Sequence, residues 1–176
     1  MVKIFCKNNN TSKTFPEGLT LMEMLASFDF EQPYPILAAK VNNVCQGLKY
    51  RAFNSRQVEF IDYTAYAGRS VYCSSLCFLL CKAAKDVFPG CRVILRRPIS
   101  KGYFCSIDKG DGAQVSLADL RQIKARMSEL VEADIPFRRH EVLVEEAIEL
   151  FRSLGYDDKV KLLETSGDVY VNYYTL

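Results

Sequence analysis

Residues 71–90 of this 176-residue chain read VYCSSLCFLLCKAAKDVFPG. Apolar side chains recur in this stretch at spacings of three and four residues, which is the period of one helix face. They are Cys73, Leu76, Cys77, Leu80, Ala83, Ala84, Val87 and Phe88. The pattern predicts a helix from Val71 to Phe88. Pro89-Gly90 ends it, because proline does not continue a helix and glycine accepts the left-handed turn that follows one.

The period of the apolar pattern changes at Gly68. Residues before it alternate between apolar and polar, which is typical of strands, whereas those after it follow the helical period. Glycine at the change permits a bend in the backbone. We therefore expect a joint at residues 63–70 and two domains, spanning residues 1–66 and 67–176.

The first predicted domain begins with a strand, because Val2 and Ile4 alternate with polar residues. Thr20 and Glu23 have the spacing of a capping box, which predicts the start of a helix. Further strands are expected over residues 36–41 and 58–61. The apolar face of the helix consists of Leu21, Met22, Met24, Leu25 and Phe28. Strands around one helix indicate a small α+β domain.

The second predicted domain follows the helix with a hairpin of two strands over residues 92–99 and 103–107. Ser116 and Asp119 form a second capping pattern, opening a helix that runs to about Ala133. A third helix runs from about Val144 to Leu154 and ends at Gly155. These elements predict helices packed on one antiparallel sheet, an α+β arrangement.

The last residues, Gly167 to Leu176, alternate as a strand up to the final position. A strand that ends so abruptly leads us to expect that the chain is part of a longer protein. It also leaves an unpaired strand edge, and such edges pair with other chains. Some self-association of the 176-residue chain is therefore expected.

Seven cysteines are present, and no two have the C-x-x-C spacing of zinc or thioredoxin-like sites. Cys73, Cys77 and Cys81 share one face of the predicted helix, which allows either a metal or redox cluster or ordinary core packing. Leucine and alanine on the same face favour packing. We expect seven reduced thiols, no metal, and Cys77 and Cys81 largely buried.

The charge is uneven along the chain. Residues 69–107 contain seven Lys or Arg and one Asp, whereas residues 108–176 contain nine Lys or Arg and fourteen Asp or Glu. The basic segment fits either a polyanion such as RNA or the acidic segment of the same fold, and the second is favoured. Its candidate polyanion contacts are Arg96, Arg97 and Lys101.

Composition is that of a globular protein, with 49% hydrophobic and 25% charged residues. The longest uncharged stretch, Ser70 to Cys81, is too short to cross a bilayer as a helix. No apolar segment follows the first lysines, so no secretory signal is evident. The sequence predicts a cytoplasmic protein without a membrane partner.

Two groups of motifs resemble known domains. Phe15-Pro16-Glu17-Gly18 with Thr20, followed by Ala38-Ala39-Lys40-Val41-Asn42, resembles the TGS domain, a ubiquitin-like β-grasp module of threonyl-tRNA synthetases and other proteins. Residues 83–90, 97–104, 120–127 and 145–151 follow, in order, the second N-terminal domain of threonyl-tRNA synthetase, the threonyl/alanyl editing domain. The resemblance covers nearly the whole chain and implies a β-grasp domain followed by an α+β editing-like domain.

The chain departs from the editing family at its site. That family begins the site with His-x-x-x-His on the first helix of the domain, and counting back from Pro89 places Ser74 and Phe78 at those positions. Serine binds zinc poorly and phenylalanine neither ligates a metal nor carries a proton. The sequence therefore predicts no catalytic residue, and a vestigial cleft near Ser74, Phe78, Lys82 and Tyr103.

Such a pair of domains also resembles the N-terminal region of bacterial uridine kinase-like nucleoside kinases. This resemblance implies a regulatory or recognition region whose partner is a C-terminal kinase domain that binds Mg-ATP. No cofactor is expected in the chain itself, because none of its nine glycines begins the G-x-x-x-x-G-K-[ST] phosphate loop. A freestanding RNA-binding module and an aminoacyl-tRNA editing or synthetase fragment are the alternatives.

Overall fold

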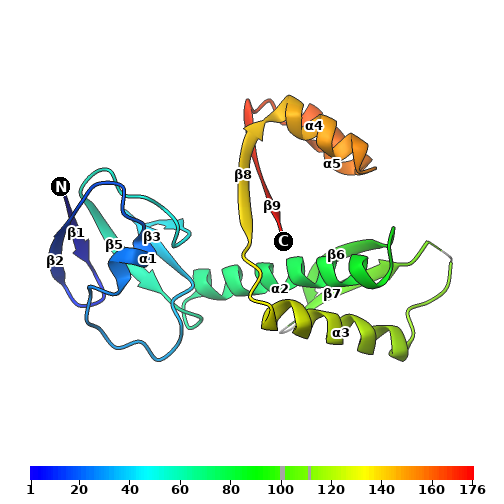
Figure 1. The fold of residues 1–176 in the computed structure, drawn as a ribbon, viewed down its shortest axis with the longest axis horizontal. Coiled ribbons are helices and arrows are strands. Elements are labelled where there is room, and N and C mark those ends of the chain that lie inside the picture. Colours follow the sequence, from blue (N-terminus) through cyan, green and yellow to red (C-terminus); the bar gives the residue numbers. More distant parts are fainter. Residues whose placement is uncertain (100–101, 111) are drawn as a thin grey trace. The chain divides into compact units, whose positions relative to one another are not determined.

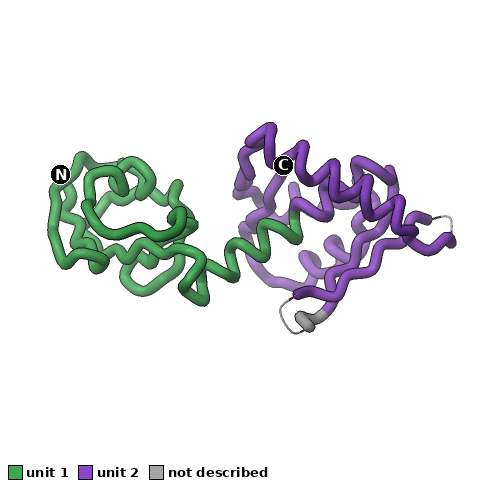
Figure 2. The backbone as a smooth tube through the Cα atoms, turned by 90° about the horizontal axis from the view of Figure 1, so that it is seen from below, with its two compact units in different colours: residues 1–78 green, residues 79–176 purple. Residues whose placement is uncertain are grey.

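The computed structural model describes residues 1–99, 102–110 and 112–176, without the side chains of residues 97–99. The chain forms two compact units, Met1–Phe78 (unit 1) and Leu79–Leu176 (unit 2), as Figure 2 shows. Their boundary lies within helix α2 (Tyr66–Val87), so one helix contributes residues to both. The domain boundary expected between residues 66 and 67 lies at the first turn of this helix.

Unit 1 contains a five-stranded mixed sheet with the strand order β2-β1-β5-β3-β4 and a short helix, α1 (Figure 1). β1 pairs with β2 as an antiparallel hairpin and with β5 in parallel. This is the β-grasp arrangement that the resemblance to the TGS domain implied. The elements are β1 (Val2–Cys6), β2 (Thr11–Phe15), α1 (Leu21–Leu25), β3 (Ala38–Val41), β4 (Val44–Gln46) and β5 (Arg56–Ile61).

The core of unit 1 lies between one face of this sheet and α1. Alternation along β1 buries Val2, Ile4 and Cys6, which pack with Leu21 and Met24 of the helix. The capping box at the start of α1 is confirmed, because Thr20 Oγ1 accepts the Glu23 N–H and the Glu23 carboxylate accepts the Thr20 N–H.

Two details of the predicted first helix are wrong. Met22 is exposed, and Phe28 enters the core from beyond the last helical residue, Leu25. The helix has only five residues, so fewer of its positions face the sheet than the apolar pattern indicated.

Helix α2 begins at Tyr66, five residues before the position predicted from the apolar pattern. Gly68 lies inside its first turn and is buried, so it does not bend the chain as expected. A Cβ atom at Gly68 would lie 1.8 Å from the backbone oxygen of Asp62. Glycine is therefore required because the chain that enters the helix passes directly over it.

A hydrophobic core in unit 2 is shared by helices and a hairpin. Leu79, Ala83 and Ala84 of α2 pack with Ile123 and Leu130 of α3. The elements after α2 are β6 (Arg92–Ile99), β7 (Gly102–Asp108), α3 (Leu117–Glu132), β8 (Arg138–Leu143), α4 (Val144–Ser153), α5 (Asp157–Glu164) and β9 (Tyr170–Thr175). Val93 and Ile107 of the hairpin and the last residue, Leu176, complete this core.

The strands of unit 2 form two separate two-stranded antiparallel sheets, β6–β7 and β8–β9, rather than the single sheet expected. β8 and β9 pair over six residues, and both contact α4. Phe151 of α4 meets Tyr173 of β9 edge to face, with ring centroids 5.8 Å apart. The second ribbon therefore folds onto its own helix instead of extending the first hairpin. The α+β class is as predicted.

Across the part of the chain that the structure describes, no helix combines the length and apolar character needed to cross a membrane.

Candidate functional site

The residues predicted to line a vestigial cleft are divided between the two units, and each is described within its own unit. Ser74 and Phe78 lie on the part of α2 that belongs to unit 1, where Ser74 is exposed and Phe78 is half-buried. Lys82 and Tyr103 belong to unit 2, where Lys82 is half-buried and Tyr103, on β7, is 50% exposed. The spacing of four residues places Ser74, Phe78 and Lys82 on one face of the helix.

Lys82 takes part in an ion-pair network between α2 and α3. Its Nζ donates to Asp86 Oδ1, and Arg126 Nε of α3 donates to Asp86 Oδ2 over 2.9 Å. Arg126 also donates to Glu129 over 2.9 Å. Burial raises the pKa of the Asp86 carboxyl, but the hydrogen bonds from Lys82 and Arg126 outweigh it and leave the pKa below its ordinary value. Asp86 thus joins the two helices, and Lys82 supports it from within α2.

Asp86→Asn is expected to lower the free energy of unfolding of unit 2 by about 1 kcal/mol at pH 7, because it removes the shared partner of two cations. A lowered pKa in the folded state contributes stability above the unfolded pKa, and this is lost as pH falls through the folded value. The difference from wild type should therefore shrink below the ordinary aspartate pKa of 3.8.

Urea unfolding followed by circular dichroism between pH 7 and pH 3 measures this difference. Asp29→Asn, at an exposed position in unit 1, is the control and should leave unit 2 unchanged. A loss for Asp86→Asn that is the same at both pH values would contradict the ion-pair explanation.

The candidate polyanion contacts are described only in part. Arg96 on β6 is exposed, and its Nε donates to Ser106 Oγ over 3.4 Å. Arg97 lies in the same strand, but its side chain is outside the described part, and Lys101 is outside the described residues. Tyr103 and Phe104 on β7 are both about half exposed. Arg96 and two aromatic rings therefore remain accessible on this hairpin.

The expectation that the acidic segment neutralises the basic one is wrong for the described residues. Of the described cations between residues 69 and 107, only Lys82 has an ion pair, and its partner Asp86 lies in the same segment. Lys85 instead donates to the Tyr156 hydroxyl and lies over that ring. The ion pairs that the structure gives to carboxylates of the acidic segment, such as Lys109–Asp119 and Arg152–Glu164, lie within that segment.

The cysteines do not form a cluster of ligands. Cys73, Cys77 and Cys81 are half-buried, so the expected burial of the latter two is only partial. Cys6 and Cys91 are the buried ones, and burial raises the pKa of both thiols. Within residues 1–99, 102–110 and 112–176, no group of three or more His, Cys, Asp and Glu side chains has the geometry to hold a metal ion.

His140, the one histidine of the chain, lies on the β8–β9 ribbon. Its ring stacks on Tyr173 with centroids 4.8 Å apart, and its Nε2 lies 2.9 Å from Thr175 Oγ1. These contacts link the two strands of the ribbon. The structure therefore gives His140 a packing role.

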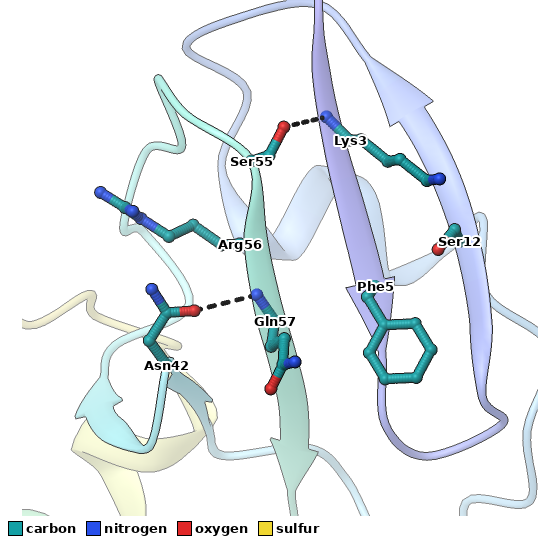
Figure 3. Close-up of a pocket in the computed structure, with 7 residues that line it drawn as sticks. All are labelled: Lys3, Phe5, Ser12, Asn42, Ser55, Arg56 and Gln57. Atoms are coloured by element: carbon teal, nitrogen blue, oxygen red, sulfur yellow. Dashed lines mark hydrogen bonds between the residues drawn. The ribbon is translucent and has the colours of Figure 1, made fainter.

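A feature that the sequence patterns did not predict is a hollow of about 340 Å³ on the sheet of unit 1 (Figure 3). Lys3, Phe5 and Arg56 line it together with hydroxyl and amide side chains. These residues come from strands far apart in the sequence. The one available signal was the alternation of β1, which places Lys3 and Phe5 on the face opposite the core.

No protein-family model matches the chain. The chain is similar to the threonine–tRNA ligase of Desulforamulus reducens, with 28% identity over 163 residues, covering 93% of the chain and 25% of the ligase. It is 30% identical over 153 residues to that of Pelodictyon phaeoclathratiforme, covering 86% and 23%. For the ligase of Azobacteroides pseudotrichonymphae the identity is 25% over 175 residues, covering 99% and 27%.

The chain therefore spans about a quarter of the length of the curated relatives that it matches. The similarity extends across both units. It bears out the likeness to threonyl-tRNA synthetases, and nothing in these comparisons supports the likeness to a uridine kinase.

Proposed function

We propose that this chain is a threonyl-tRNA synthetase-like region that recognises tRNA and has lost the hydrolytic editing reaction. Its support is a similarity to threonine–tRNA ligases that covers 86–99% of the chain in the three relatives above, together with the β-grasp sheet of unit 1. This is the synthetase-fragment alternative of the sequence analysis. Neither a kinase partner nor a Mg-ATP site forms part of it.

One observation supports the proposed loss of the hydrolytic editing reaction. The two helix positions at which the editing family has histidine hold Ser74 and Phe78. Hydrolysis of an aminoacyl ester needs a group that takes a proton from water or holds it for attack. A phenyl ring does neither, and the ordinary serine hydroxyl is a poor base. Lys82, one turn further along the helix, is already paired with Asp86.

In this proposal the role of the region is therefore to recognise tRNA. Arg96 is exposed and has no carboxylate partner among the described residues, and Tyr103 and Phe104 present about half of their surfaces beside it in the same hairpin. A cation meets RNA phosphates, and aromatic rings stack on unpaired bases. This combination favours RNA over an uncharged partner.

Filter binding of uncharged threonine tRNA to the 176-residue chain tests recognition. Saturable binding is expected, and Arg96→Gln should weaken it about threefold to tenfold at low salt, because one phosphate contact is lost. Lys49→Gln is the matched control, since Lys49 is equally exposed and lies in unit 1. Absence of saturable binding, or equal losses in both variants, would contradict recognition at the β6–β7 hairpin.

A further inference from the structure

We infer that the open face of the unit 1 sheet, opposite its core, binds a single-stranded nucleic acid. The hollow of about 340 Å³ lies on this face, over β1, β2 and β5 (Figure 3). Val2, Ile4 and Cys6 of β1 point into the core, so Lys3 and Phe5 between them point to the opposite face. The surface is therefore separate from the Ser74 and Phe78 positions on α2.

Strand register places Phe5 at the centre of the hollow. Ser12 on β2 and Gln57 on β5 are the residues directly opposite Phe5 on its two sides. The Phe5 ring is half-buried and flanked by a hydroxyl and an amide. A flat ring between two hydrogen-bonding side chains suits a nucleic-acid base, which stacks by its face and bonds by its edge.

Hydrogen bonds to the backbone hold two other lining side chains in place. Ser55 Oγ accepts the Lys3 N–H over 3.1 Å, and Asn42 Oδ1 accepts the Gln57 N–H over 3.0 Å. Both bonds are drawn in Figure 3. The polar rim of the hollow is thus organised before any ligand arrives, which lowers the entropic cost of binding.

The electrostatics of this face favour an anion. Lys3 lies on this face and has no ion-pair partner among the described residues. Arg56 borders the hollow, but it is the register partner of Ile4, so its side chain is directed away from Lys3 and Phe5 (Figure 3). Its lining contains no carboxylate. Glu59, the acid on the same face of β5, is already paired with Lys40 at 3.5 Å. Lys7, at the end of β1, adds a further cation whose Nζ donates to Asn43.

The occupant is a strand rather than a single small molecule or a duplex. The hollow is open, and Lys3 and Lys7 share the face of Phe5 and lie on either side of it along the chain, so they meet successive phosphates better than one phosphate group. A duplex keeps its bases stacked on one another and offers none to Phe5. A single strand supplies both the unstacked base and the neighbouring phosphates.

The test is fluorescence anisotropy of a labelled 12-nucleotide oligouridylate with the full 176-residue chain at several salt concentrations. Phe5→Leu should raise Kd about tenfold while leaving the salt dependence unchanged, because stacking is lost and charge is kept. Lys3→Gln should raise Kd and reduce the slope of log K against log salt by about 0.7, the value for one lost contact to a single strand.

Matched controls lie in the same unit. Phe53→Leu removes another exposed ring and Lys49→Gln another exposed cation, and both lie outside the hollow. Both should leave Kd and the salt slope at wild-type values. Circular dichroism melting of every variant shows that unit 1 remains folded.

Three results would overturn the inference: no saturable binding at low salt, inorganic polyphosphate binding as tightly as the oligonucleotide, or loss of binding in Arg96→Gln but not in Lys3→Gln. The last result would move the contact to the β6–β7 hairpin. Arg96→Gln should weaken binding of tRNA but leave the Kd for the oligouridylate unchanged, so one variant distinguishes the two surfaces. Each proposal therefore fails by its own measurement.

Discussion

Gly68→Ala is expected to lower the free energy of unfolding of unit 1 by about 3 kcal/mol, because the new methyl group has no space. Its Cβ would lie 1.8 Å from the Asp62 backbone oxygen and 2.7 Å from the Asp62 carbonyl carbon. These are backbone atoms, so no side-chain rotation relieves the clash. The first turn of α2 must unwind, or the end of β5 must move.

The same segment is held by local hydrogen bonds that a shift would break. Asp62 Oδ1 accepts the Thr64 N–H over 2.8 Å, and the Arg69 N–H donates to the Ala65 oxygen over 2.9 Å. The bonds from Thr64 lower the pKa of the Asp62 carboxyl. Hydrogen exchange at the Arg69 amide should therefore accelerate in Gly68→Ala.

Gly47→Ala is the control, because no atom lies within 4 Å of its added Cβ and its backbone is not left-handed. Alanine there should leave stability unchanged or raise it slightly by restricting the unfolded chain. Urea unfolding of the two variants makes the comparison. Equal midpoints for Gly68→Ala and wild type would contradict the close approach seen at Asp62.

Elements with a strong local signal were predicted from the sequence. The apolar stripe from Cys73 to Val87 lies within α2, and the capping boxes at Thr20 and Ser116 both form. Gly155 has the positive φ of 72° expected after a helix. Each of these features depends on residues within one or two helical turns of each other, so local sequence patterns are sufficient to predict it.

Elements decided by distant contacts were not predicted. Helix α5 was missed because its eight residues, DDKVKLLE, contain only three apolar positions, of which Val160 and Leu163 are buried. β6–β7 and β8–β9 form separate sheets because β8 and β9 pack against α4. A local sequence pattern does not predict this tertiary contact.

The candidate site residues also divide into those set by local sequence and those brought together by tertiary contacts. The assignment of Ser74 and Phe78 to the histidine positions of the editing family comes from their spacing in the sequence and stays a prediction. The hollow around Phe5 could not be found in this way, since Ser12, Gln57 and Asn42 join it only through strand register and loop geometry. The ion pair of Lys82 with Asp86 has a helical spacing of four residues, but the added contact from Arg126 is tertiary.

We expect the chain to lack the hydrolytic editing reaction. General acid–base catalysis by a positioned side chain contributes about a hundredfold to ten-thousandfold to a rate. With Ser74 and Phe78 at the histidine positions, this contribution is absent, and the chain should add nothing to the spontaneous hydrolysis of an aminoacyl ester. Binding of the tRNA, in contrast, should persist, because the β6–β7 hairpin lies in other elements.

Single-turnover hydrolysis of mischarged threonine tRNA shows whether this threonyl-tRNA synthetase-like region has the fold without the editing reaction. The chain is present in excess at neutral pH, and Ser74→Ala is measured in parallel. We expect one hydrolysis rate for wild type, Ser74→Ala and buffer alone. A rate that rises with the concentration of the chain and disappears in Ser74→Ala would contradict it.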